Sequence, residues 1–204
     1  LGESARALSH LQSVRELAAA HPGTLEFQNL RAMQVLGDAL AEVNRYEDAE
    51  AVLGEGIARA RRDQPEQRKL AFDMQSRLAW LMFEQGQIEP ALRLAREAWQ
   101  SLVATVPADD QQRLDAGKRY AGLLAASGEH DKAMTLLRDV MQHRIRLNGP
   151  EHPLTLVVRR ELATALLQKR DFAAAELELR QLLAAYERLY GEDNGYTAGV
   201  HGML

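Results

Sequence analysis

The stretch ELATALLQKRDFAAAELELR, residues 161–180, has three earlier counterparts in the chain at a fixed spacing of 42 residues. They are RYAGLLAASGEHDKAMTLLR at 119–138, RLAWLMFEQGQIEPALRLAR at 77–96 and VLGDALAEVNRYEDAEAVLG at 35–54. The spacing does not slip, because one alanine keeps its place in every copy: Ala49, Ala91, Ala133 and Ala175. A fixed period of this length predicts an array of helical repeats, in which each repeat packs mainly against its neighbours.

Apolar residues within each copy follow the period of an α-helix on both sides of a short turn. Gly86 and Gly128 stand at this turn in two copies, and Asn44 and Arg170 take the equivalent place in the other two. Glycine often ends a helix because it adopts a positive φ without strain, and asparagine does so less readily. The first repeat is expected to turn at 44–45, and later helices are predicted at about 66–84, 88–104, 110–126, 130–147, 153–169 and 172–189.

Helix-breaking residues mark the joints between repeats in the same phase: Gly23, Pro65, Pro107, Gly149 and Gly191. We therefore expect an all-α fold in which residues 1–204 form a single array of antiparallel helix pairs. Full repeats are predicted at 23–64, 65–106, 107–148 and 149–190. Residues 1–22 would be the second helix of a preceding repeat and residues 191–204 the start of a further one, so we expect a fragment of a longer protein.

Composition restricts the class of protein. The chain is 46% hydrophobic and 26% charged, as expected of a soluble folded protein. It contains no cysteine, and no apolar run approaches the roughly 20 residues that would span a membrane. A net charge of −4 and a pI of about 5.9 argue against a nucleic-acid binder. We expect a cytoplasmic domain without nucleic-acid or membrane binding.

Motifs for catalysis and cofactor binding are missing from the sequence. It has no HExxH, P-loop, GxSxG or GxGxxG motif, and no two histidines have metal-ligand spacing on one helical face. His21 and His152 precede prolines at repeat joints, where a turn or capping role is expected. We predict no enzymatic activity, cofactor or metal for this fragment, although an attached catalytic domain stays open.

A second pattern is a leucine or tyrosine followed by a small residue, as in Leu36-Gly37, Leu78-Ala79, Tyr120-Ala121 and Leu162-Ala163. After the turn comes a bulkier residue, namely Tyr46, Ile88, His130 or Phe172. This pattern resembles the tetratricopeptide repeat, whose usual period is about 34 residues. The longer period and the joint GPEHPLTL at 149–156 are similar to the kinesin-light-chain-like variant, which also occurs in bacterial regulatory proteins. The resemblance implies a right-handed α-solenoid, a superhelix with a concave groove that binds a partner protein.

The resemblance also implies that the groove is lined by the first helix of each repeat. Its inward positions carry Gln34, Asp38, Arg77, Trp80, Phe83, Lys118, Arg119, Gly122, Arg160 and Thr164. Four of these are cations, and guanidinium groups suit carboxylates and phosphates. We therefore expect a protein or peptide partner whose bound segment is acidic with apolar anchors. The plainer alternative is a solvated charged face on which Trp80 only fills a gap between helices.

Two further functions stay open. The first is a structural or regulatory array that tethers an attached kinase or transcription-factor module and forms homo-oligomers through its ends. The second is the ligand-sensing domain of a regulator. The sequence does not name the partner.

Three expectations concern packing. Gly37, Ala79, Ala121 and Ala163 are expected to let each first helix meet the second at the repeated alanine. Trp99, eight residues after Ala91, is assigned to the core. Gly54 and Gly56 lie inside a helix, where each glycine costs about 0.5–1 kcal/mol relative to alanine, so this helix is the expected weak point.

Overall fold

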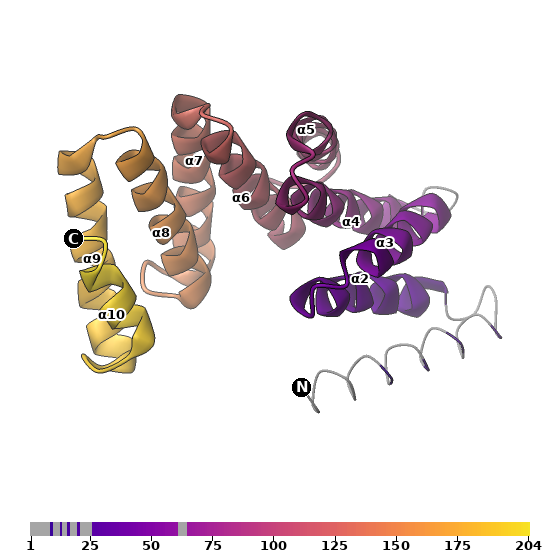
Figure 1. Ribbon diagram of the computed structural model, residues 1–204, viewed down its shortest axis with the longest axis horizontal. Coiled ribbons are helices and arrows are strands. Elements are labelled where there is room, and N and C mark those ends of the chain that lie inside the picture. Colours follow the sequence, from indigo (N-terminus) through magenta and orange to yellow (C-terminus); the bar gives the residue numbers. More distant parts are fainter. Residues whose placement is uncertain (1–8, 10–12, 14–15, 17–19, 21–25, 61–64) are drawn as a thin grey trace. The chain divides into compact units, whose positions relative to one another are not determined.

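The computed structural model describes residues 26–60 and 65–204, together with Ser9, Ser13, Glu16 and Ala20. Every regular element in this part of the chain is an α-helix, which confirms the all-α solenoid of helix pairs (Figure 1). The predicted helix within residues 1–22 falls largely outside the described residues, and so does His21.

The chain divides into two compact units, residues 1–106 and 107–204, and the boundary coincides with a predicted repeat boundary. The first unit contains α2 (Glu26–Glu42), α3 (Tyr46–Ala60), α4 (Pro65–Glu84) and α5 (Ile88–Thr105). Here α2 pairs with α3 and α4 with α5, while α3 packs on α4 and α2 lies beside α4. The two first helices of successive repeats are therefore neighbours.

The second unit repeats this arrangement with α6 (Gln111–Ala126), α7 (His130–Asn148), α8 (Pro153–Gln168), α9 (Phe172–Tyr190) and α10 (Gly195–His201). Here α6 pairs with α7 and α8 with α9, while α7 packs on α8, α6 lies beside α8 and α10 packs on α9 (Figure 1). The helix bounds lie within a few residues of those expected from the period. The assignment of residues 1–204 to one continuous array stays a prediction.

The turns inside the four pairs have one geometry. Gly86 and Gly128 have φ of +80° and +88°, and Asn44 and Arg170 have +59° and +66°. The residue after each of them donates its backbone N–H to a carbonyl five residues back, over 2.8–2.9 Å. This bond satisfies a carbonyl at the end of the first helix. The predicted turn role of these four residues is confirmed, including the two that are not glycine.

Small residues are completely buried where the helices cross. The exposed fraction is 0% for every repeated alanine of the second helices and for the alanines that follow leucine or tyrosine on the first helices. These residues are Ala49, Ala91, Ala133 and Ala175, and Ala79, Ala121 and Ala163, respectively. A Cβ on Gly37 would lie 2.6 Å from the side chain of Leu53, which is closer than side-chain atoms approach. The expected close approach is therefore present, but Gly37 meets Leu53, one turn after Ala49.

Two packing predictions need correction. Trp99 is half-buried, whereas Ala98 and Leu102 take the buried positions of α5. Residues eight apart differ by about 80° around a helix axis, so Trp99 lies beside the stripe begun by Ala91. Gly56 also allows close packing between α3 and α4, because a Cβ at this position would lie 2.8 Å from Sδ of Met74 on α4.

The joints between repeats carry a hydrogen-bond pattern that the sequence analysis missed. Thr155 and Thr197 are buried, and each donates its hydroxyl to the carbonyl of the glycine six residues earlier, over 2.9 and 2.8 Å. His152 accepts from the backbone N–H of Leu154, which confirms its capping role, and Asn194 caps α10 in the same way. The sequences GPEHPLT and GEDNGYT already contain this pattern at a spacing of 42 residues.

Candidate partner-binding surface

The predicted site residues fall into two groups, one in each unit. Gln34 and Asp38 lie on α2 and Arg77, Trp80 and Phe83 on the neighbouring α4. Lys118, Arg119 and Gly122 lie on α6 and Arg160 and Thr164 on the neighbouring α8. The structure therefore brings together residues from two repeats within each unit.

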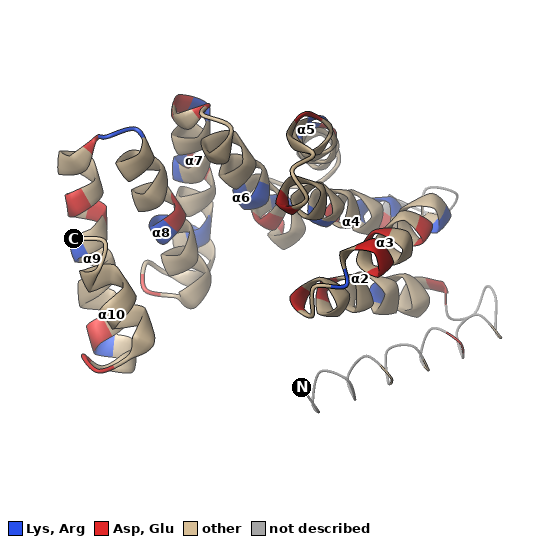
Figure 2. Cartoon of the chain, viewed as in Figure 1, with Lys and Arg blue, Asp and Glu red and all other residues tan. Residues whose placement is uncertain are grey.

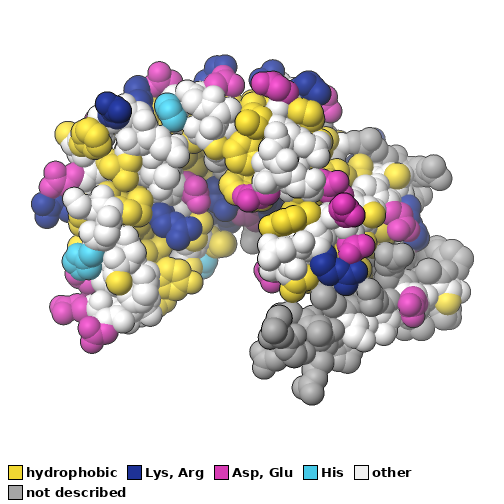
Figure 3. Space-filling model, in the orientation of Figure 1, with side chains coloured by type: hydrophobic (Ala, Val, Ile, Leu, Met, Phe, Trp, Pro, Cys, Tyr) yellow, Lys and Arg dark blue, Asp and Glu magenta, His cyan; other side chains and the backbone are white. Residues whose placement is uncertain are grey.

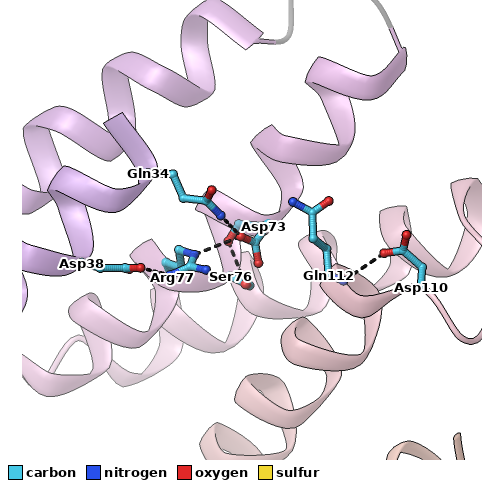
Figure 4. Close-up of polar contacts among 7 residues, drawn as sticks. All are labelled: Gln34, Asp38, Asp73, Ser76, Arg77, Asp110 and Gln112. Atoms are coloured by element: carbon cyan, nitrogen blue, oxygen red, sulfur yellow. Dashed lines mark hydrogen bonds and ion pairs between the residues drawn. The ribbon is translucent and has the colours of Figure 1, made fainter. Parts of the chain in front are cut away.

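Asp73 is the centre of the polar contacts in the first unit (Figure 4). Only 1% of this residue is exposed, and its Oδ2 accepts hydrogen bonds from the amide of Gln34 and from Nε of Arg77, the latter over 2.9 Å. Arg77 also forms an ion pair with Asp38. The sequence analysis missed Asp73, although its spacing of four residues from Arg77 on a helix is a known signal for an ion pair.

The sequence analysis counted Arg77 among four cations that would bind an acidic segment, but Arg77 already pairs with two carboxylates of the chain itself. Burial acts to lower the pKa of Arg77, but Asp73 and Asp38 outweigh it and raise that pKa. The guanidinium stays charged and is compensated by two carboxylates. Its main role in this unit is to join α2 and α4.

Trp80 and Phe83 form an aromatic pair on α4 next to this network. Their ring centroids lie 6.1 Å apart, with ring planes tilted by 36°. Trp80 has an exposed fraction of 37%, so much of its indole surface faces solvent. Val35 on α2 is also exposed. This arrangement favours an accessible apolar surface over a tryptophan that only fills a gap.

Lys118 lies on α6 in the second unit and has no direct anionic partner among the described residues. It is half-buried, and it makes no direct hydrogen bond or ion pair with any residue that the structure describes. Burial lowers the pKa of its ammonium group, Arg119 and Arg160 lower that pKa further, and Glu161 and Asp115 act in the opposite direction. Figure 2 shows positively charged residues on both α6 and α8.

The two carboxylates near Lys118 are each close to another cation. Asp115 forms an ion pair with Arg144, a buried residue of α7. Glu161 lies 4.0 Å from the guanidinium of Arg160. Each carboxylate is therefore shared between Lys118 and another cation. Figure 3 shows basic side chains among hydrophobic ones over α8. We call Lys118, Arg119 and Arg160 the α6–α8 cationic surface.

Gly122 and Thr164 make more modest contributions. Gly122 is half-buried on α6. The hydroxyl of Thr164 donates to the carbonyl of Arg160 over 3.0 Å, so its proton is already used within α8. Thr164 could still accept a hydrogen bond from a ligand, but it is not an available donor.

A tyrosine cluster near Arg160 was missed by the sequence analysis. The ring centroids of Tyr186, Tyr190 and Tyr196 lie 5.5–5.7 Å apart. Burial raises the pKa of the Tyr186 phenol, and Arg160 acts to lower it. Tyr186 and Tyr190 lie on the second helix α9 and Tyr196 lies on α10, so none of them is among the predicted site residues.

One open pocket lies away from the predicted site residues. It has a volume of about 400 Å³ and is lined by Asn44, Arg45, Tyr46, Glu47, Asp48 and Gln85. Across the described ranges there is no cluster of metal-ligating side chains and no helix long and apolar enough to cross a membrane. The candidate surface therefore rests on the first helices.

Comparisons with known proteins place the fold. Residues 115–198 match the family model described as tetratricopeptide repeat. BtubC (BKLC) from P. vanneervenii is similar in structure, with 17% identity, a TM-score of 0.77 and coverage of 98% of this chain and 82% of that one. A putative kinesin light chain from Podosopora anserina with nearly identical TPR-like repeats has 22% identity, a TM-score of 0.67 and coverage of 93% and 90%.

A third similar structure is MamA from Desulfovibrio magneticus RS-1, with 16% identity, a TM-score of 0.55 and coverage of 90% of this chain and 97% of that one. A search of curated proteins gave no match. The class of protein is an α-solenoid of tetratricopeptide-like helix pairs. The chain has a fold similar to that of the tetratricopeptide-like repeats of these proteins, and residues 115–198 match the tetratricopeptide-repeat model; a fold of this type generally serves as a scaffold for protein–protein interactions and is typically non-catalytic.

Proposed function

We propose that this protein binds an acidic segment of a partner protein, and that the anionic side chains of that segment bind the α6–α8 cationic surface. The observation that carries this proposal is Lys118, a half-buried cation without a direct anionic partner among the described residues. A buried charge is unfavourable unless it is paired. A carboxylate or phosphate from a partner would compensate it and form charge-assisted hydrogen bonds.

The first unit has a different role in this proposal. Arg77 already has Asp38 and Asp73 as partners, so an incoming anion would have to compete with two carboxylates. Exposed Trp80 and half-buried Phe83 offer an aromatic surface instead. We assign them to contacts with apolar side chains of a partner, and we assign Gln34 and Asp38 to holding Asp73 and Arg77 in place.

The test uses two fluorescent peptides that alternate leucine with either glutamate or glutamine, and binding is followed by anisotropy. The glutamate peptide should bind more tightly, and its affinity should fall as salt is added because screening weakens exposed charge pairs. Arg119→Glu combined with Arg160→Glu should weaken binding by at least about tenfold, since a hydrogen bond to a charged group is worth about 1.5–3 kcal/mol.

The control makes the same charge change elsewhere. Arg138 and Arg180 are exposed, are also 42 residues apart, and lie on the second helices α7 and α9. Arg138→Glu combined with Arg180→Glu should bind almost as the wild type does. Equal losses in the two double variants, or equal binding of the two peptides, would show that the α6–α8 cationic surface is not the site.

A further inference from the structure

We propose that Tyr190 and Tyr196 form an oxidative cross-linking site, where a one-electron oxidant joins their rings as dityrosine and so ties α10 to α9. The observation that carries this proposal is the contact among Tyr186, Tyr190 and Tyr196, whose ring centroids lie 5.5–5.7 Å apart. Three of the five tyrosines of the chain gather at this one joint. The cross-link needs no partner protein and does not depend on the proposed function.

The end of the last helix pair brings these tyrosines together. Tyr186 and Tyr190 are four residues apart on α9, so their side chains lie on the same face of the helix. Gly191 ends α9 with a φ of +85°, and α10 begins four residues later. Thr197 donates its hydroxyl to the carbonyl of Gly191 over 2.8 Å, and this bond holds the joint that carries Tyr196.

The preceding joint has the same hydrogen bond but no tyrosines. Thr155 donates to the carbonyl of Gly149 in the same way. The positions equivalent to Tyr186, Tyr190 and Tyr196, 42 residues earlier, are Arg144, Asn148 and Leu154. The joint therefore forms without tyrosine side chains, so the cluster is not a requirement of the fold.

Exposure distinguishes the members of the cluster. Tyr186 has an exposed fraction of only 4%, whereas Tyr190 and Tyr196 have 39% and 57%. An oxidant in solution therefore reaches the latter two, whose centroids lie 5.5 Å apart with ring planes tilted by 39°. Exposed side chains change rotamer rapidly, so a small rotation brings the ring carbons next to the two hydroxyl groups into bonding distance. We therefore expect Tyr190 and Tyr196 to be the pair that couples.

The reaction balances with a peroxide as the final oxidant. Each phenol loses one electron and one proton, which leaves a phenoxyl radical with spin density on the ring carbons next to the oxygen. Two radicals couple through one new carbon–carbon bond between such carbons. The hydrogens on these carbons then pass to the oxygens and restore both phenols. The two electrons break the O–O bond of the peroxide: hydrogen peroxide also takes the two protons and gives two waters, whereas persulfate gives two sulfates and leaves the protons in water.

The cross-link would hold α10 in place. Among the described helices α10 packs only on α9, and it has seven residues. Residues 1–204 contain no cysteine, so no disulfide within them provides a covalent link. A cross-link lowers the conformational entropy of the opened state and so favours the closed one. Backbone amides of α10 should therefore exchange hydrogen several-fold more slowly after oxidation, because exchange reports local opening.

The experiment irradiates the purified chain with ruthenium tris-bipyridine and persulfate, a one-electron oxidant that also works in urea. A glutamate-specific protease then cleaves after Glu187 and Glu192, which puts the three tyrosines of the cluster in separate peptides. Mass spectrometry should show peptide 188–192 joined to peptide 193–204 as the main dityrosine product. In a mixture of normal and heavy-nitrogen chains, this product should be all light or all heavy, because the link forms within one chain.

The controls separate folded geometry from mere closeness in sequence. Concentrated urea should lower the yield of the joined peptides several-fold, and Tyr186→Phe should leave it nearly unchanged in the folded chain. Tyr196→Phe keeps a ring in the cluster and should abolish this product, while Tyr46→Phe, on α3, should not affect it.

The wild type alone can overturn the proposal. It is wrong if oxidation gives no dityrosine, or if the main product contains the peptide of Tyr186 or mixes light and heavy chains. It is also wrong if urea leaves the yield unchanged, or if the amides of α10 exchange at the same rate before and after cross-linking.

Discussion

Arg77 and Lys118 both lie on first helices but have opposite electrostatic surroundings. Arg77 pairs directly with carboxylates from its own helix and from α2, whereas Lys118 has charges of both signs around it and no direct anionic partner among the described residues. A cation on a first helix therefore joins two helices in the first unit, whereas in the second unit we propose that Lys118 binds a partner. This difference leads to opposite predictions for the removal of the two charges.

Replacement of Arg77 by methionine should destabilise the protein, because it removes the guanidinium that pairs with the carboxylates of Asp73 and Asp38. Removal of one member of a fully buried pair costs about 3–5 kcal/mol. The side chain of Arg77 is 23% exposed, so we expect the lower end of that range. Urea denaturation followed by circular dichroism measures the effect, and a loss below about 1 kcal/mol would contradict a structural role.

Replacement of Lys118 by methionine should instead stabilise the protein at neutral pH. The pKa of Lys118 is lower in the folded state than in the unfolded state, so its charge opposes folding wherever the ammonium is charged in both states. This unfavourable contribution decreases as the pH rises through the folded pKa, and it vanishes above the unfolded value of about 10.4. Methionine keeps the apolar stem of the side chain and removes the charge.

The stability difference between the Lys118→Met variant and the wild type should therefore be largest near pH 7 and should shrink toward pH 10. Parallel urea titrations at the two pH values measure it. A variant that is less stable than the wild type at pH 7 would mean that Lys118 has a stabilising contact in the folded state.

Sequence reasoning at the residue scale predicted candidate residues on the first helices but could not decide which of them are paired with opposite charges. The period places Arg77 and Arg119 at equivalent positions, but it does not show which residues pair with them. Arg77 pairs with Asp73 on its own helix and with Asp38 on α2. The contact to Asp38 depends on the distance between α2 and α4 and on side-chain rotamers. The spacing between repeats determines neither the distance between the helices nor the rotamers of their side chains.

At the scale of single helices, α3 contains two glycines with different surroundings. A Cβ on Gly54 would meet nothing within 4 Å, whereas one on Gly56 would meet the side chain of Met74 at 2.8 Å. Gly54→Ala should therefore stabilise the protein by about 0.5–1 kcal/mol, the usual difference between the two residues inside a helix. Gly56→Ala should destabilise it by about 1–3 kcal/mol, because the added methyl group overpacks the contact between α3 and α4.

The two alanine variants are mutual controls, since they make the same chemical change two residues apart on one helix. Thermal or urea denaturation should give shifts of opposite sign. If both variants gain stability, the side chain of Met74 moves away from the added methyl group at little cost, and Gly56 is not required for packing.

Helix bounds and turns were more predictable than these contacts. The period predicts the turn positions even where no glycine is present, because Asn44 and Arg170 adopt the same left-handed conformation as Gly86 and Gly128. Trp99 was misplaced because a spacing of eight residues was treated as if it returned to the same face. Periodicity defines which face is buried, but a large side chain at its edge stays half-exposed when alanine and leucine already fill the crossing.

At the scale of the whole molecule, the division into two compact units at a repeat boundary has an energetic consequence. In a repeat array each repeat contributes its own stability and interacts with its nearest neighbours, so substitutions in distant repeats change the free energy of unfolding independently. Gly54 belongs to the first unit and Lys118 to the second. Neither residue shares a described contact with the other.

Gly54→Ala and Lys118→Met should therefore add in the double variant. Independent sites usually add to within about 0.3–0.5 kcal/mol, so the double variant should gain the sum of the two single changes within that margin. The measurement is a set of four urea titrations at pH 7, on the wild type, both single variants and the double variant. One shared slope of unfolding free energy against urea concentration is used only if it fits all four titrations. A larger departure from additivity would show that the two substitutions do not act independently.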